Sequence, residues 1–440
     1  MMELISFAGM FVLIFIAWLF SVNKRAINYK TVVMGTLLQI VFALIVLKSP
    51  PGRAFFKVMN DVVIKLLSFS EDGARFLFGN LVSNYIPVGT IQDNGVFTSG
   101  GAPGEGIRTV ASAGAMFAFS VLPTIIFFSS LMSVLYYLGI MQAVVVFFAK
   151  IMARLMGTSG AESLSASANI FVGQKEAPLV VRPYVSEMTR SELMAVMTGG
   201  MATIAGGVMA AYVGILKDLL PNIAGHLMAA SVMSAPAALV MAKIIIPETE
   251  EPKTRGVVKI HYHAPDANVI DAAANGATVG LQLALNVGAC LIAFMALLSL
   301  ANFMVGKIGI IVAGANDLSL QKIFGWVFAP LAWIMGVPAK DVIQIGNFMG
   351  QKTVLNEFVA YFNLAVFLKN NPGVLSERSV VIATYALCGF SNFLSIAIQI
   401  GGIGAMAPER RHDLARLGLY AVLAGSLACF MTATIAGFLI

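Results

Sequence analysis

Long uncharged stretches of apolar residues recur along the chain, and they constrain its fold more than any other feature. A helix needs about 20 apolar residues to cross a bilayer. Only 11% of the 440 residues are charged, against roughly 25% in a soluble domain. The sequence therefore predicts an all-α polytopic membrane protein with eight transmembrane helices. The eight stretches are Leu4–Asn23, Thr31–Leu47, Thr109–Ala149, Leu193–Leu216, Leu219–Ala242, Ala272–Gly306, Ser379–Pro408 and Leu417–Ile440.

Some segments do not read as simple spans. Thr109–Ala149 and Ala272–Gly306 are long enough to hold a span plus an interfacial piece. Between 55 and 66, apolar residues recur at helical spacing with charges between them, which indicates a helix lying on the membrane surface. Ser83–Arg108 is rich in Gly, Asn and Pro and is expected to be a loop.

Basic residues gather in the short polar segments between the stretches. Cytoplasmic loops carry an excess of Lys and Arg, so these segments are expected to be cytoplasmic. With eight spans, both termini then lie outside. The net charge of +6 is accounted for by these loops, and we expect no nucleic-acid partner. The clusters are Lys24/Arg25/Lys30, Lys150/Arg154, Arg182/Arg190, Lys253/Arg255/Lys259 and Arg410/Arg411/Arg416.

The polar segments divide the chain into four parts. Residues 1–106 hold the first spans, expected to serve as a scaffold, and the surface helix. Residues 107–247 and 269–440 form two related halves, and the polar segment 248–268 is a cytoplasmic linker between them. This division predicts an internal repeat.

The two halves share five features in the same order. Each has a Gly-Gln-Lys triplet, a glutamate, a polar turn, a Ser-Glu pair, and then an apolar helix with small and polar residues at its middle. By the loop assignment, the first copy enters from the cytoplasm and the second from outside, which is the pattern of an inverted repeat. The matching residues are Gly173-Gln174-Lys175 and Gly350-Gln351-Lys352, Glu176 and Glu357, and Ser191-Glu192 and Ser376-Glu377.

Each half also carries a segment too polar for a lipid-facing helix. Residues 163–188 and 344–371 are rich in Asn, Gln, Lys, Glu and Pro. Irregular backbone at membrane depth persists only against protein or water. We therefore predict two re-entrant helical hairpins here. Each is followed by a broken helix (193–216 and 379–408) and a further span (219–242 and 417–440).

Glu176 and Glu357 are the central candidates for function. An ionisable group inside a membrane costs at least ~3 kcal/mol on insertion scales, so a functional role is the default interpretation. The alternative is a structural ion pair, of Glu176 with Lys175 or Arg182, and of Glu357 with Lys352. Carboxylates accept hydrogen bonds from hydroxyls and ring N–H groups, and amides both donate and accept. The amides concerned are Gln174 and Asn392. This set suits a neutral, polyhydroxylated, heterocyclic solute.

Oxygen-bearing groups near the broken segments suggest a cation. Hard cations take oxygen ligands, and unwound helices expose carbonyl oxygens to them. The candidates are the Asn169 and Thr203 side chains and the Val172 and Ile204 carbonyls. Na⁺ is the first choice of coupling ion. Protons are the alternative, carried by Glu176 or Glu357.

Three motifs resemble the signatures of the concentrative nucleoside transporter family, in family order. They are Gly173-Gln174-Lys175-Glu176-Ala177-Pro178-Leu179-Val180-Val181-Arg182-Pro183-Tyr184, then Asn356-Glu357-Phe358-Val359-Ala360-Tyr361, then Cys388-Gly389-Phe390-Ser391-Asn392-Phe393 with Gly401-Gly402-Ile403-Gly404 and Pro408-Glu409-Arg410-Arg411. The resemblance to bacterial members spans roughly residues 160–440. It implies a multi-pass inner-membrane symporter that imports nucleosides such as uridine by alternating access. It also implies a homotrimer that needs no cofactor beyond its coupling ion.

The resemblance also implies roles for individual residues. Gln174, Lys175, Glu176 and Val208 would lie at the nucleobase, and Glu357, Phe390, Asn392 and Ser395 at the ribose. Asn169, Val172, Thr203 and Ile204 would bind sodium. Lys175 departs from the family pattern, which has Thr or Ser there. The lysine therefore bears on base selectivity and on ion coupling.

Two rival functions belong to other classes. Gly157-Thr158-Ser159-Gly160 matches a short serine-nucleophile pattern, as in an intramembrane serine protease. Such a serine needs a neighbouring base, but of the four histidines only His226 lies in a predicted span. We therefore expect Ser159 to form a turn and the protein not to be an enzyme. A channel would need a continuous polar lining or a ring of like residues, which paired hairpins do not provide.

Overall fold

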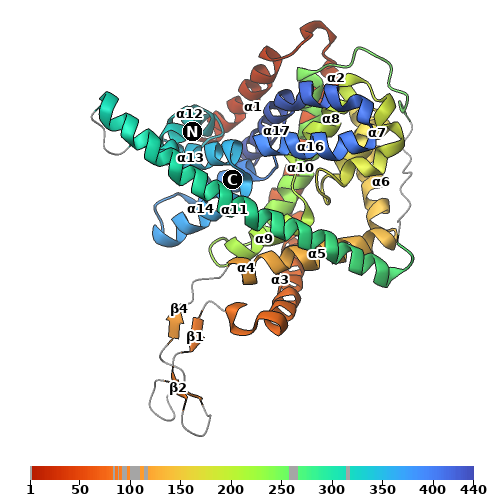
Figure 1. The fold of residues 1–440 in the computed structure, drawn as a ribbon. Helices are drawn as coiled ribbons and strands as arrows, with labels where there is room; N and C mark the ends of the chain where they lie inside the picture. Colours follow the sequence, from red (N-terminus) through yellow and green to blue (C-terminus); the bar gives the residue numbers. More distant parts are fainter. Residues whose placement is uncertain are drawn as a thin grey trace.

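The computed structural model is built almost entirely of helices (Figure 1). It describes residues 2–82, 85–87, 89–91, 97–99, 110–112, 117–256, 266–313 and 318–440. Seven helical segments are long and apolar enough to span a membrane in this described part: Met2–Leu19, Tyr29–Lys48, Ala118–Tyr137, Arg190–Leu216, Ile223–Ile245, Val269–Ile311 and Pro408–Leu439. The eighth predicted stretch, Ser379–Pro408, is divided between two short helices, Glu377–Leu387 and Phe393–Met406, separated by residues 388–392.

The N-terminal part contains the first helices and a small strand-bearing segment. Its elements are α1 (Met2–Leu19), η1 (Lys24–Ala26), α2 (Tyr29–Ala43), η2 (Leu44–Lys48), α3 (Pro50–Phe78) and η3 (Gly79–Val82). A helix is present over the expected range as α3, with Phe55, Val58 and Val62 exposed on it, and its place on the membrane surface stays a prediction. The expectation of a loop at Ser83–Arg108 is wrong for part of that segment, since antiparallel strands pair there and with residues just beyond it. They are β1 (Tyr85–Pro87) with β4 (Val110–Ser112), and β2 (Gly89–Ile91) with β3 (Phe97–Ser99).

The two long stretches fold differently from each other. Thr109–Ala149 contains α4 (Phe117–Ser120), α5 (Leu122–Tyr137) and the start of α6 (Ile140–Met156), as a span plus a further helix. Ala272–Gly306 instead lies within one continuous helix of 45 residues, α11 (Val269–Ala313), so no break in the helix separates a span from an interfacial piece there. In Figure 1, α11 crosses the molecule and α5 packs beside it.

The two halves repeat one order of elements. The first half has α7 (Gly160–Ala168), the 3-10 helix η4 (Ala177–Glu187), α8 (Arg190–Ala202), α9 (Gly206–Leu216) and α10 (Ile223–Ile245). The second has α13 (Val342–Val354), α14 (Glu357–Asn370), α15 (Glu377–Leu387), α16 (Phe393–Met406), η5 (Pro408–Arg410) and α17 (Arg411–Leu439), preceded by α12 (Leu320–Ile334). Each half therefore reads as a hairpin, a broken helix and a span. Residues 257–265 of the linker lie outside the described residues.

Helix α1 marks the two ends of the bundle. Near its start, the Ser6 hydroxyl donates to the Met335 carbonyl (2.9 Å). Just beyond its end, the Val22 N–H donates to the Ile245 carbonyl (3.0 Å). The 18 residues of α1 rise about 27 Å, so Met335 and Ile245 lie at opposite ends of the bundle.

The broken helices begin at these opposite ends. Ser191, the second residue of α8, donates to the Ile246 carbonyl (2.7 Å). Arg378, the second residue of α15, donates to the Gly336 carbonyl (2.9 Å). The two halves therefore run in opposite directions, which is the inverted repeat that the sequence predicts.

Candidate substrate and cation site

The two broken helices meet at their breaks. The Phe390 N–H donates to the Thr203 carbonyl (3.3 Å). The Cys429 thiol lies between the two breaks, 3.5 Å from the Ala202 carbonyl and 3.1 Å from the Cys388 carbonyl. Gly389 has φ +149°, and a Cβ there would lie 2.9 Å from the Met201 carbonyl. Only glycine allows both this backbone conformation and this close approach.

Two helix N-termini point at the same place. Glu357 is the first residue of α14, and Asn392 caps α16 by accepting from the Ser395 N–H (2.9 Å). The Asn392 amide donates to one Glu357 oxygen (2.8 Å), and the Tyr212 hydroxyl donates to the other (3.0 Å). A helix N-terminus favours a negative group, so the carboxylate is held by two donors and a dipole. Tyr212 was not predicted, because an aromatic residue in an apolar helix carries no signal of its partner.

The first hairpin joins this group through Gln174. The Gln174 amide donates to the Ser395 hydroxyl (3.1 Å). In turn, the Gln399 amide donates to the Gln174 carbonyl oxygen (3.1 Å). A continuous polar network thus runs from the first hairpin through α16 to Glu357 in the second. Four predicted residues, Gln174, Ser395, Asn392 and Glu357, are brought together in it. Gln399 was missed, because one amide in an apolar run does not reveal what it faces.

The other predicted site residues lie around this network. The Glu176 side chain is exposed and its carboxylate folds back against Gly173. Lys175 is also exposed, and its aliphatic stem would lie 3.2 Å from a Cβ on Gly402. Val208 is buried in the first turn of α9 and Phe390 is half-buried at the break of the second half. Phe390 adjoins the network, because the Asn392 N–H donates to the Phe390 carbonyl (2.9 Å).

The ion pairs proposed as structural alternatives do not form among the described residues. No salt bridge joins Glu176 to Lys175 or Arg182. Lys352 is fully buried, and its ammonium donates to the Ala386 carbonyl (2.8 Å) in the last turn of α15. A cation is favoured at a helix C-terminus, so Lys352 has a structural role that leaves Glu357 to its hydroxyl and amide donors.

The oxygen groups near the first break fit a small cation. The Asn169 side-chain oxygen is buried and has no hydrogen-bond partner in the described part of the chain, while its nitrogen donates to the Ser165 carbonyl. The Thr203 hydroxyl donates to the Gly199 carbonyl (2.9 Å), which leaves its lone pairs free to coordinate. Gly199 places these groups near each other, since a Cβ there would lie 3.3 Å from the Asn169 nitrogen. The set consists of oxygen atoms, the ligands that hard cations take.

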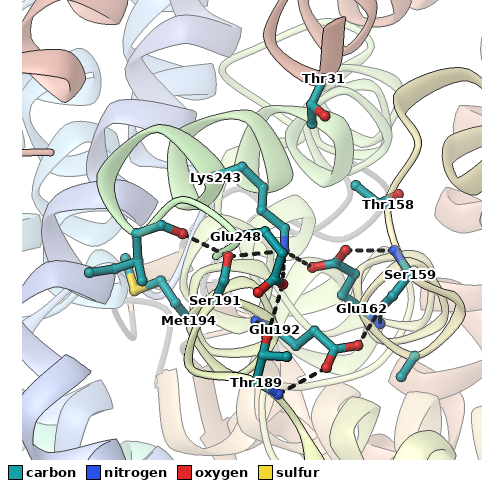
Figure 2. Close-up of polar contacts among 12 residues, drawn as sticks. Thr31, Thr158, Ser159, Glu162, Thr189, Ser191, Glu192, Met194, Lys243 and Glu248 are labelled. Atoms are coloured by element: carbon teal, nitrogen blue, oxygen red, sulfur yellow. Dashed lines mark hydrogen bonds and ion pairs between the residues drawn. The ribbon is translucent and has the colours of Figure 1, made fainter. Parts of the chain in front are cut away.

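A second polar cluster explains Ser159 (Figure 2). Ser159 caps α7 and Thr189 caps α8, each in a capping box with Glu162 or Glu192 three residues on. The Ser159 hydroxyl also donates to Glu192 (2.5 Å), which links the two boxes. Lys243 pairs with Glu162 (2.7 Å) beside them. The serine of the protease-like pattern is therefore a helix cap with a carboxylate partner, and neither His226 nor His412, the two histidines that the structure describes, is among its hydrogen-bond partners.

Family models match most of the chain. Residues 8–81 match the model described as "Na+ dependent nucleoside transporter N-terminus" and residues 226–437 match "Na+ dependent nucleoside transporter C-terminus". Between them, residues 118–219 match a model described as "Nucleoside recognition". This last range contains the first hairpin and α8 and α9.

Similar proteins and solved structures agree with these models. The chain is 43% identical to the nucleoside permease NupC of Helicobacter pylori, over 100% of this chain and 98% of that protein. It is 46% identical to an uncharacterized transporter of Haemophilus influenzae, over 100% and 98% of the two chains. Identity to the mouse sodium/nucleoside cotransporter 1 is 38%, over 99% of this chain and 64% of that protein.

The fold is also that of a solved transporter. The structure of CNTnw in an inward-facing, substrate-bound state matches with a TM-score of 0.86 and 44% identity, over 100% of this chain and 98% of that one. An intermediate state of a CNTnw variant matches with a TM-score of 0.88 at 45% identity, over 100% and 99%. The chain therefore belongs to the concentrative, Na⁺-dependent nucleoside transporter family, whose members are transporters and not enzymes.

Proposed function

We propose that this protein is a secondary active symporter that imports nucleosides such as uridine across the inner membrane, driven by a Na⁺ gradient. The observation that carries the proposal is the network that links Gln174 to Glu357 through Ser395 and Asn392. It joins both hairpins at the point where both broken helices meet. A solute bound there contacts each half of the inverted repeat, as alternating access requires.

Glu357, Asn392 and Ser395 are proposed to bind the ribose, with Phe390 against the sugar. A carboxylate accepts two hydrogen bonds from neighbouring hydroxyls, and such charge-assisted bonds are about twice as strong as neutral ones. Tyr212 and Asn392 hold the Glu357 carboxylate in place. The sugar therefore meets an acceptor that is already oriented.

The first hairpin is proposed to bind the nucleobase through Gln174, Lys175, Glu176 and Val208. Gln174 lies within hydrogen-bond distance of Ser395, which places it next to the proposed ribose site. Glu176 is exposed on the same hairpin and can accept from a ring N–H. The base and sugar groups of one nucleoside are matched by two adjacent sets of side chains.

Na⁺ is proposed to bind Asn169, Thr203 and the Val172 and Ile204 carbonyls. The unpartnered Asn169 oxygen supports this assignment. When bound, the ion supplies a positive charge that stabilises the turn of the hairpin against the broken helix. Binding of the ion and of the solute would be coupled, because the hairpin that carries Asn169 also carries Gln174.

The membership of this family supports a proposal for the oligomeric state. A homotrimer is proposed, with one transport site in each protomer. Many large apolar side chains on α11, such as Leu285, Ile292 and Phe303, are exposed in the single chain. They would face lipid or a second protomer.

The test is uptake of radiolabelled uridine by purified protein in proteoliposomes. An inward Na⁺ gradient should drive accumulation above the external concentration, and replacing Na⁺ by choline should abolish it. Accumulation driven only by an inward H⁺ gradient would replace sodium by protons as the coupling ion. Uptake that only equilibrates under either gradient would contradict symport, and an absence of uptake of any nucleoside would contradict the substrate class.

A further inference from the structure

Gln399 is a fully buried glutamine in the middle of α16 that no part of the proposed function uses. It shares one face of α16 with Ser395 and Gly402, because residues four and seven apart lie on the same side of a helix. This face lies against the first hairpin, with Ser395 and Gln399 at Gln174 and Gly402 at the stem of Lys175.

The Gln399 amide makes two hydrogen bonds through the same nitrogen. It donates to the Met197 carbonyl of α8 (3.0 Å) and to the Gln174 side-chain oxygen (3.1 Å). Both partners come from the first half of the repeat, whereas Gln399 belongs to the second. Gly200 makes room for this approach, since a Cβ there would lie 2.8 Å from the Gln399 nitrogen and 2.9 Å from the Gln174 Cβ.

The Met197 contact fixes which way both amides point. The oxygen and nitrogen of a glutamine amide have nearly the same shape, so their assignment has to come from the hydrogen-bond partners. A backbone carbonyl can only accept, so the Gln399 atom that faces Met197 must be the nitrogen. The Gln174 atom bonded to that same nitrogen must then be its oxygen.

The direction of Gln174 follows from this relay. With its oxygen turned to Gln399, its NH₂ group is turned to Ser395. An amide nitrogen carries two hydrogens, and Ser395 accepts one of them. The second remains for a solute in the site.

We propose that Gln399 is a positioning residue, which fixes the Gln174 amide so that its donor end faces the solute. This inference rests on the proposed contact between Gln174 and the nucleobase. It adds a rule of selectivity: the base group at Gln174 is an acceptor, such as a ring carbonyl oxygen. An exocyclic amino group at the same position would put two donors face to face.

The experiment compares uridine with cytidine, which differ in a carbonyl against an amino group and in the adjacent ring nitrogen, an N–H in uridine and an acceptor in cytidine. The ring nitrogen contributes equally in the native protein and in the Gln399 variants, so the change in preference between them reports on Gln174. Each nucleoside competes against radiolabelled uridine uptake in proteoliposomes, and the readout is the ratio of the two inhibition constants. This ratio does not depend on how much of the protein is folded. For the native protein we expect uridine to inhibit more strongly. In Gln399→Met the Gln174 amide is free to turn over, so the preference for uridine should weaken. We expect the ratio to change roughly two- to tenfold, which corresponds to the net contribution of one neutral hydrogen bond.

Gln39→Met is the matched control. Gln39 is equally buried, lies in α2, and neither amide atom has a partner among the described residues. Its replacement should leave the ratio unchanged. Gln399→Leu serves as a second variant if Gln399→Met does not insert.

Gln174→Ala separates the two proposals. If Gln174→Ala changes the ratio and neither Gln399 variant does, the positioning role of Gln399 is wrong and the base contact stands. If Gln174→Ala also leaves the ratio and the uridine inhibition constant unchanged, the base contact itself is wrong. A native protein that binds cytidine more tightly than uridine would overturn the selectivity rule.

Discussion

Glu357 is the residue whose charge the site is arranged to hold. Both of its oxygens accept from neutral donors, Tyr212 and Asn392, and no cation pairs with it among the described residues. In Glu357→Gln, an NH₂ group replaces one acceptor and faces a donor. Loss of charge-assisted bonds worth about 1.5–3 kcal/mol each predicts at least a tenfold loss of uridine uptake. Uptake in proteoliposomes, normalised to inserted protein, measures it.

Glu377→Gln is the control for that substitution. Glu377 is also the first residue of a helix, α15, but its side chain is exposed. Like Glu357, it lies at a helix N-terminus, where the helix dipole favours a negative charge. Unlike Glu357, it is not held by the buried donors Tyr212 and Asn392. Uptake by Glu377→Gln should remain close to native, and equal losses in the two variants would mean that the effect concerns helix stability rather than the sugar.

Lys175 is expected to set the preference between pyrimidine and purine nucleosides. Its stem packs towards Gly402, seven residues along α16 from Ser395, which is about 10 Å along the helix axis. We expect the ammonium to lie at the edge of the proposed site, where the larger purine ring would extend. We predict that Lys175→Thr changes the inhibition profile of a nucleoside panel.

Lys369→Thr is the control for Lys175→Thr. Lys369, in the last turn of α14, is an exposed lysine outside the network, and Lys369→Thr should have the native profile. If Lys175→Thr has it as well, the lysine does not influence the base. The effect on Na⁺ dependence is measured in the same preparations.

At the scale of elements, the starts of the two hairpins are tied down in the same way. In the first half, Ser159 at the start of α7 donates to Glu192 in the first turn of α8. In the second, Asp341 at the start of α13 accepts from the Ser376 N–H and hydroxyl at the start of α15 (3.1 and 2.8 Å). The serine lies on the hairpin in the first half and on the broken helix in the second, and the carboxylate lies opposite it in each case. In both halves the hairpin is therefore hydrogen-bonded to the broken helix that follows it.

Lys243 is predicted to hold the first of these ties. Its ammonium pairs with Glu162 (2.7 Å) and Glu248 (3.1 Å) and donates to Ser191 (3.0 Å). Lys243→Met leaves the Glu162 charge buried without a cation, although the Ser159 N–H still donates to it. Removing one partner of a buried ion pair costs roughly 3–5 kcal/mol. The thermal unfolding midpoint in detergent should fall clearly.

The Lys253–Glu187 pair offers the matched control. Its ammonium and carboxylate are 2.9 Å apart, but the two side chains are 64% and 52% exposed. Exposed pairs contribute about 0–1 kcal/mol, so Lys253→Met should leave the midpoint nearly unchanged. Equal shifts for Lys243→Met and Lys253→Met would show that burial of the first cluster does not matter.

The hydrogen bonds between Asp341 and Ser376 are expected to lose their stabilising effect at acid pH. Burial raises the pKa of this carboxyl, but hydrogen bonds from Ser379 and Ser376 outweigh it, and the net pKa lies below the usual 3.8. A carboxyl whose pKa is lower in the folded than in the unfolded state stabilises the fold at pH values above its unfolded pKa. That stability is lost as the pH falls through the folded pKa. Asp341→Asn should therefore unfold at lower temperature near neutral pH, and the difference from the native protein should shrink below pH ~4.

The sequence predicted these elements better than their contacts. The hairpins and breaks were found because Gln174, Glu176 and Glu357 are too polar for lipid, which is a local property. The Gly-Gln-Lys triplets look equivalent, yet Lys175 is exposed while Lys352 is buried against a helix end. Gln399 and Tyr212 stayed hidden because their importance comes from partners far along the chain. The unbroken length of α11 was not predicted, because nothing in an apolar run marks where a span stops.

At the scale of the whole molecule, the two termini lie side by side. The rings of Phe7 in α1 and Phe438 in α17 are 5.4 Å apart, and the N and C labels are close together in Figure 1. The basic segments gather at the other end of α1, where Val22 meets Ile245. The packing puts both termini at one end of the bundle. We expect this end to lie outside, because the positive-inside rule assigns the basic segments at the other end to the cytoplasm.

Cysteine labelling of intact cells tests that orientation. Single cysteines are introduced as Met2→Cys, Ile440→Cys and Lys253→Cys, with the three native cysteines replaced by alanine. A membrane-impermeant maleimide should label the first two positions in intact cells and the third only after permeabilisation, because Lys253 is exposed in the linker at the opposite end. The reverse pattern would invert the orientation and leave the fold intact. Labelling of only one terminus from outside would contradict the Phe7–Phe438 contact. It would also contradict an even number of spans, which the predicted orientation of the two halves requires.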